Sequence, residues 1–176
     1  IYEDVVQLLK STKLGITPTF IVVYNGPSGE TFFYQTERLW EDRKLLNFFR
    51  KDELIKLRRP TFYWPDDHYA AQMGLTMKKL YDRGITMQMG AHGNMMGLGA
   101  HWEMELFTHG SFSNYDAIEI ATINGFKHHG LDHVLGSIEP GKLADFVIMQ
   151  KNPLENIRNT RTIEYVVNNG VVYSVK

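Results

Sequence analysis

Seven histidines are the residues of this chain best suited to chemistry near neutral pH, because imidazole both binds metals and exchanges protons. They are His68, His92, His101, His109, His128, His129 and His133. His92 is the best placed, since it follows the alternating residues 85–89 in the sequence Gly-Ala-His-Gly, where a strand ends and a loop begins. Reacting groups of parallel β/α folds project from such strand ends, so His92 is a candidate catalytic residue. The alternative is a loop histidine that bonds to nearby backbone.

Three residues that open the next predicted helix form a second candidate group. His101, Trp102 and Glu103 lie where free backbone N–H groups and the positive end of the helix dipole favour anions. His101 could therefore contact a substrate. Glu103 has an alternative role as a first-turn carboxylate that satisfies only the helix start.

The other motifs that could bind a metal or a nucleotide, or supply a nucleophile, are weaker. His129 and His133 have the four-residue spacing of metal ligands on a helix, but Gly130 interrupts it and the HExxH glutamate is missing, so we interpret the pair as structural. Glycines between residues 90 and 99 do not complete a dinucleotide fingerprint. There is no cysteine, and no serine lies in a G-x-S-x-G elbow. Metal-assisted hydrolysis is the chemistry that remains.

Composition and charge narrow the class of protein. The 176 residues are 43% hydrophobic, with 19 Lys and Arg against 20 Asp and Glu. Such a chain can bury a core, and its balanced charge predicts no strong non-specific attraction to nucleic acid or to an acidic membrane surface. The longest apolar run, residues 20–24, is far shorter than the roughly 20 residues of a membrane-spanning helix. Because the chain begins with Ile1, we expect a removed leader or a piece of a longer polypeptide.

Helices and strands alternate in the part of the chain that must position these groups. Residues 2–12 and a segment after Pro65 have the apolar spacing of helices, whereas 16–24 and 85–89 have the pattern of strands. We expect the two strands to pair in parallel, because crossover helices then cover the sheet. Between them lies an aromatic-rich excursion, 30–64, which is either a substrate-covering loop or a packing or dimer surface.

The C-terminal part of the chain passes from helix to strand. Helices are expected from about residue 100 to 109 and after the capping residue Ser113. The β features that follow are a Pro-Gly turn at 139–142, a strand at 143–149 and a hairpin closed by Asn169-Gly170. This tail is too short to bury a sheet face alone, so we expect it to pair with strands from elsewhere.

Several passages between residues 84 and 160 resemble the C-terminal part of the metal-dependent amidohydrolase superfamily. They are GITMQMGAHGNMMGLGAHWEMELF, SNYDAIEIATINGFKHHGLDHVLGSIEPGKLADFVIM (113–149) and KNPLENIRNT (151–160). Residues 16–30 are similar to the preceding barrel strand of the same group. The likeness is greatest to imidazolonepropionase-like and prolidase-like members, including those that carry a TolB-type β-propeller.

The resemblance implies a fold and a division of the chain. A complete (β/α)8 TIM-like barrel takes about 250 residues, so this α/β chain would be the last two β/α units plus strands of a small β-sandwich. The barrel part would be 1–134 and the sandwich part 135–176. The family's His-x-His on the first strand and its ligands on the fourth, fifth and sixth strands have no counterparts here. The expected partner is therefore the N-terminal remainder of the same enzyme.

The resemblance also implies hydrolysis of a C–N bond in a small-molecule substrate, either a cyclic amide or a dipeptide-like amide, by metal-activated water. The divalent metal, with zinc first, would have most of its ligands outside this chain. The family usually carries an Asp at the end of strand eight, which binds metal and relays a proton. His92 stands at that place, so it is the expected metal ligand or proton relay.

His101, Trp102 and Glu103 are expected either to form the wall of the substrate site or to support that wall from behind, and Tyr24 and Asn25 could line the same mouth. The rival hypothesis is a non-catalytic binding or interaction module on a degenerate scaffold, with His92 as a relic. Neither nucleic acid nor a membrane is expected as a partner. Homo-oligomerisation stays open, as does the compartment, which is periplasmic, secreted or cytoplasmic.

Overall fold

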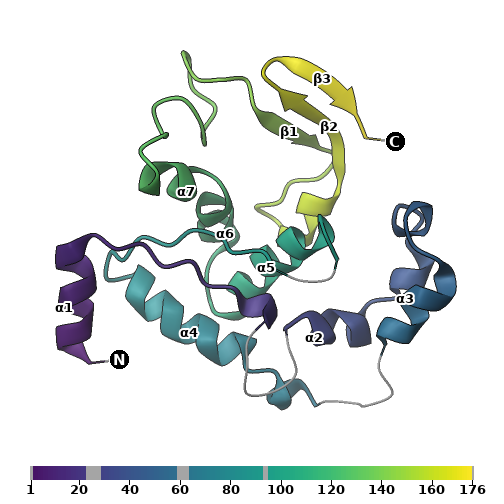
Figure 1. The fold of residues 1–176 in the computed structure, drawn as a ribbon, viewed down its shortest axis with the longest axis horizontal. Helices are drawn as coiled ribbons and strands as arrows, with labels where there is room; N and C mark the ends of the chain where they lie inside the picture. The colour runs from purple at the N-terminus through teal and green to yellow at the C-terminus, as the bar shows by residue number, and fades with distance from the viewer. Residues whose placement is uncertain (1, 23–28, 59–63, 93–94, 176) are drawn as a thin grey trace.

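The computed structural model describes residues 2–22, 29–58, 64–92 and 95–175 (Figure 1). Its α-helices are α1 Glu3–Thr12, α2 Gly29–Thr36, α3 Lys51–Leu57, α4 Ala70–Tyr81, α5 Leu98–His109, α6 Asn114–Ala121 and α7 Ile123–His128. Its strands are β1 Phe146–Met149, β2 Ile163–Asn168 and β3 Val171–Ser174. Short 3-10 turns are η1 Phe20–Val22, η2 Leu39–Glu41, η3 Leu45–Asn47, η4 Pro65–Asp67 and η5 Ile157–Arg161. None of the helices in the described ranges has the length and apolar character needed to cross a membrane.

Two extended segments pair in parallel in the helical part, as the sequence predicts, although they form only the isolated bridge of Ile16 with Met87 and neither is a regular strand. Ile16 N donates to Thr86 O at 3.0 Å, and Gln88 N donates to Ile16 O at 3.1 Å. Gly90 N then donates to Pro18 O, also at 3.1 Å. Pro18 fits this position because it has to supply only a carbonyl. The second segment therefore ends beside the first, and both lead into loops at the same edge.

The predicted strand 16–24 is wrong from Phe20 onward, where the chain enters η1. Successive N–H groups of a strand point to opposite sides, whereas those of Phe20 and Ile21 both donate to the carboxylate of Glu103. That arrangement requires the chain to bend. Residues 23 and 24 lie outside the described residues.

Aromatic side chains form the centre of the core between α2, α5 and η1. The rings of Phe33 and Trp102 stack with their centroids 4.8 Å apart and their planes 5° apart. Phe20 meets Phe107 edge to face, also at 4.8 Å. Such pairs contribute about 0.5–1.5 kcal/mol beyond the burial of their area. The aromatic-rich excursion therefore supplies part of the core through Phe33.

Helix α4 lies unusually close to the end of α5. A Cβ atom built on Gly74 would lie 2.5 Å from Gly110 Cα, a distance at which something must move. The contact of these two backbones therefore needs glycine. Helix α1 is held less closely: of its predicted apolar face Val6 is buried, whereas Tyr2 and Leu8 are exposed.

The predicted helix start at Ser113 is confirmed, and two other helices are followed by glycines. Ser113 Oγ accepts from Asp116 N at 3.0 Å, and Asp116 Oδ2 accepts from Ser113 N at 2.9 Å, which is a complete capping box. Gly84 after α4 and Gly130 after α7 both have positive φ angles, +85° and +70°, where glycine avoids the steric cost of a side chain. The residue types at these positions are therefore sufficient to explain where these helices begin or end.

The C-terminal tail forms a three-stranded antiparallel sheet in the order β1-β2-β3. Asn169 and Gly170 close the β2–β3 hairpin with φ angles of +47° and +80°, as a type I′ turn requires. Figure 1 shows the sheet beside α5 and η5, away from α1. The strand expected at 143–149 begins only at Phe146. The three strands pair with one another, and pairing with strands from elsewhere stays a prediction.

Candidate functional site

His92 lies just beyond the parallel pair, and its side chain is exposed. Its loop leaves the strand through Gly90, where a Cβ atom would lie 2.3 Å from Thr19 Oγ1 and 2.8 Å from Pro18 O. Glycine therefore lets the end of the second segment approach the first. This is the strand-end position that the sequence predicts for His92, while its chemical role stays a prediction.

Glu103 is completely buried and binds the backbone that follows the neighbouring strand. Its Oε1 accepts from Phe20 N at 2.7 Å, and its Oε2 accepts from Ile21 N at 2.9 Å. Burial raises the pKa of Glu103 to about 8, although the two N–H groups act in the opposite direction. Its carboxylate satisfies backbone donors across the fold, not those at the start of its own helix.

Glu30 makes the reciprocal bond, from the helix after the first extended segment to the backbone after the second. This buried residue lies in the first turn of α2, and its Oε1 accepts from Met95 N at 3.3 Å. Met95 precedes α5 and lies in the segment that follows the second strand. The segments after the two strands are therefore joined by side-chain bonds from both directions.

His101 and Trp102 have partners inside the scaffold. His101 Nδ1 lies 3.0 Å from Thr160 Oγ1 of η5. Burial, with the positive charges of Arg161 and Lys44, lowers the pKa of His101 to about 4, so the ring is neutral near pH 7. Trp102 is 0% exposed and stacks on Phe33. The structure thus places both residues in packed surroundings, and their contact with substrate stays a prediction.

The other two predicted substrate contacts, Tyr24 and Asn25, lie outside the described residues. His129 and His133, interpreted from sequence as structural, are both exposed. Neither belongs to a metal-binding group among the residues that the structure describes.

An ionic cluster that the sequence did not predict binds η5 to α5 and to the end of α2. Glu105, nearly buried, accepts from Arg158 Nε at 2.9 Å and from Arg158 Nη2 at 2.6 Å. Arg161 donates to Glu37 at 2.9 Å through both terminal nitrogens and reaches Glu105 at 3.4 Å. A signal was present in the three-residue spacing of the arginines, because residues three apart share one side of a 3-10 turn.

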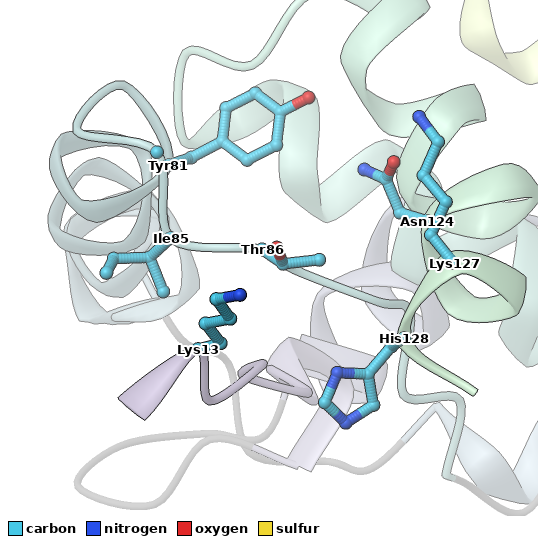
Figure 2. A pocket seen from close by; sticks show the side chains of 8 residues that line it. Lys13, Tyr81, Ile85, Thr86, Asn124, Lys127 and His128 are labelled. Atoms are coloured by element: carbon cyan, nitrogen blue, oxygen red, sulfur yellow. The ribbon is translucent and has the colours of Figure 1, made fainter. Parts of the chain in front are cut away.

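A polar pocket of about 520 Å³ lies at the other end of the second strand, beside Thr86 (Figure 2). Helix α1 is followed by Lys13 as its C-cap, α4 ends at Tyr81 and α7 ends at His128, and all three residues line the pocket. Cations near helix C-termini are stabilised by the helix dipole. Lys13 therefore has a structural explanation here, and the pocket is not the candidate active site.

A metal site needs more donors than this part of the protein brings together. The described ranges contain no group of three or more His, Cys, Asp or Glu side chains that could hold a metal ion. His92 offers one imidazole, whereas a catalytic zinc usually has three protein ligands. The described residues therefore do not form a metal site by themselves.

Comparison with known proteins identifies the family. The profile of the amidohydrolase family matches residues 66–175, which include everything from α4 to β3. The chain belongs to the amidohydrolase family. The resemblance of the sequence passages around His92 and the Pro-Gly turn is thereby confirmed.

Individual relatives of this amidohydrolase chain are larger proteins. Guanine deaminase of Escherichia coli (strain K12) is 27% identical over 128 residues, which cover 65% of this chain and 28% of the deaminase. A Xaa-Pro dipeptidase solved with bound methionine has a TM-score of 0.65 at 22% identity, covering 99% of this chain and 38% of the dipeptidase.

Ochratoxinase of A. niger has a TM-score of 0.63 at 20% identity, covering 99% of this chain and 35% of the ochratoxinase chain. At these identities the solved structures show the fold alone. The amidohydrolase chain thus has a partial α/β fold with a three-stranded sheet, and it spans well under half of these relatives.

Proposed function

We propose that the chain is the C-terminal segment of a hydrolase that cleaves C–N bonds. The observation that carries the proposal is the position of His92 at the end of the second of two extended segments that pair in parallel, within a chain of the amidohydrolase family. Relatives named as a guanine deaminase and a Xaa-Pro dipeptidase support this reaction class. A dipeptide-like or cyclic amide is the proposed small-molecule substrate.

The finer fold assignment belongs to the same proposal. Residues 1–134 would be the last two β/α units of a barrel, and 135–176 would contribute strands to a small β-sandwich. The parallel pairing of 16–18 with 86–90 supports the first part, because helices follow both segments. The separate antiparallel sheet supports the second. The N-terminal remainder of the polypeptide would supply the other strands.

His92 is the proposed acting group of this chain, as a ligand of a divalent metal, zinc first, or as a proton relay. Its imidazole nitrogens can donate to a metal or carry a proton. A metal at such a site, when bound, supplies an acidified water and polarises the substrate carbonyl. The other ligands would come from outside these 176 residues.

Substrate contact is proposed for Tyr24 and Asn25, and a supporting role behind the wall of the site for His101, Trp102 and Glu103. The buried partners of the last three residues support this division.

The test compares His92→Gln with His133→Gln in the full-length protein that contains this chain. His133 is a matched control because it is an exposed histidine outside the proposed site. The assays are release of amine or ammonia from Xaa-Pro dipeptides, cyclic amides and aminopurines, with metal content measured by mass spectrometry. We expect turnover of at least one class, a loss of about 100-fold or more in kcat/KM for His92→Gln, and little change for the control. A folded, metal-free protein without turnover would instead be a non-catalytic module.

A further inference from the structure

Two buried carboxylates connect the segments that follow the parallel strands, and they do so in opposite directions. Glu103, in the helix after the second strand, accepts from Phe20 N and Ile21 N, which follow the first strand, at 2.7 and 2.9 Å. Glu30, in the helix after the first strand, accepts from Met95 N, which follows the second, at 3.3 Å. Each segment is thus held by a side chain that belongs to the other unit.

The same packing reaches His92. A Cβ atom built on Gly99 would lie 3.6 Å from His92 O and 3.6 Å from Ile21 Cδ1. The first turn of α5 therefore lies against the backbone of His92 and against the side chain of Ile21. Ile21 is also the residue whose N–H group Glu103 binds. A shift of η1 would consequently be transmitted to the loop that carries His92.

If the link between these segments were purely structural, apolar side chains could provide it at a lower cost in free energy. Burying a carboxylate costs free energy that its hydrogen bonds must offset. Glu103 is 0% exposed, so solvent water does not readily replace a lost hydrogen-bond partner. The two directional hydrogen bonds of Glu103 fix geometry in a way that apolar packing does not. The carboxylates are therefore suited to setting a position.

We infer that Glu103 and Glu30 are a reciprocal pair of positioning residues that fix the His92 loop against the segment after the neighbouring strand. They act through Ile21 and Met95 and do not touch substrate. This inference rests on the proposed function in one respect, namely that His92 is the acting group.

The experiment uses the full-length protein with Glu103→Gln, Glu30→Gln and, as a matched control, Glu37→Gln. At position 103, where both oxygens accept, glutamine keeps the shape and one acceptor oxygen but turns an NH2 group towards a donor. At position 30, glutamine leaves Met95 N with a weaker, amide acceptor. Glu37 is also largely buried and loses its pairing with Arg161, yet it bonds to neither segment. Amide hydrogen exchange is measured at residue resolution. The NMR signal of the His92 ring, assigned by its loss in His92→Gln, reports the position of the loop.

We expect the amides of Phe20 and Ile21 in Glu103→Gln, and of Met95 in Glu30→Gln, to exchange about tenfold faster or more. In both variants the His92 ring signal should broaden or split, whereas Glu37→Gln should leave that signal and these amides unchanged. A folded Glu103→Gln protein with an unaltered His92 signal would overturn the inference. Equal acceleration over the whole core, or the same His92 change in the control, would also overturn it.

If Glu103→Gln does not fold, Glu30→Gln still decides the question, because it weakens a bond between the same two segments. None of these measurements requires substrate or turnover. An inactive wild-type protein would therefore count against the proposed function and leave the positioning result standing.

Discussion

Arg158 binds Glu105 through two nitrogens, Nε at 2.9 Å and Nη2 at 2.6 Å, and so attaches the segment before the hairpin to the middle of α5. The carboxylate is nearly buried, whereas the arginine is about half exposed, with a side-chain exposure of 50%. Paired hydrogen bonds between a guanidinium and a carboxylate are strong and directional. In this pair the arginine matters mainly because it satisfies a charge that water does not reach freely.

Replacing Arg158 with Ala should lower the free energy of unfolding by about 1–3 kcal/mol, because a buried carboxylate loses two charge-assisted bonds. Arg161, at 3.4 Å from Glu105, limits the loss. Urea denaturation of the full-length protein measures the effect. Arg38→Ala is the control, since Arg38 pairs with Glu41 at the surface and should change stability by less than about 1 kcal/mol. Equal effects of the two substitutions would contradict the assignment.

Gly74→Ala should destabilise the protein by about 1–3 kcal/mol, because the new methyl group meets the backbone of Gly110 at 2.5 Å. Gly125→Ala is the matched control within a helix. Its methyl group would lie 3.8 Å from Gln88 Cβ, an ordinary contact, so helix propensity should make the change neutral or stabilising. Thermal unfolding of both variants checks the prediction, and a Gly74→Ala protein as stable as wild type would refute it.

The buried Glu103 should make stability fall as pH rises. Its pKa is about 8 in the folded protein and near 4.5 when exposed, so the folded state binds more protons between these values. Its contribution is complete below about pH 4.5 and is lost as the pH rises towards 8. Glu103→Gln should remove this part of the slope, which denaturation at several pH values will show. Parallel pH profiles for the variant and wild type would disagree with burial of this carboxyl.

His101 should produce the opposite dependence. Its pKa is lowered from 6.5 to about 4 in the fold, so the stability that it contributes is present above pH 6.5 and is lost as the pH falls towards 4. His101→Gln can still bond to Thr160 but cannot titrate, so its stability should decline less in acid. His133→Gln, at an exposed histidine, should keep the wild-type profile. Unchanged acid sensitivity of His101→Gln would argue against the buried, neutral ring.

Short-range features of this fold could be predicted from sequence, and the long-range ones could not. The Ser113 capping box and the Asn169-Gly170 turn depend on residues within a few positions of each other, so their residue types are sufficient. The bend at Phe20 depends on a carboxylate 83 residues away, which no local pattern contains.

The candidate site shows the same limit. The strand-end position of His92 follows from the alternating residue types at 85–89 and from Gly90, and both are local features of the sequence. The surroundings of His101 and Glu103 depend on η5 and η1, which join α5 only in the folded chain. Sequence reasoning therefore located His92 but not the bonds that hold its loop.

The attachment of η5 to α5 also sets a limit on how far the chain can be shortened from its C-terminus. A truncation before residue 157 would delete Arg158 and Arg161 and leave the buried Glu105 without either guanidinium. It would delete Thr160 as well, the hydrogen-bond partner of His101. The hairpin beyond residue 162 supplies none of these groups. Helix α5 should therefore keep its partners when the hairpin is removed, and lose them when the truncation extends to Arg161 and beyond.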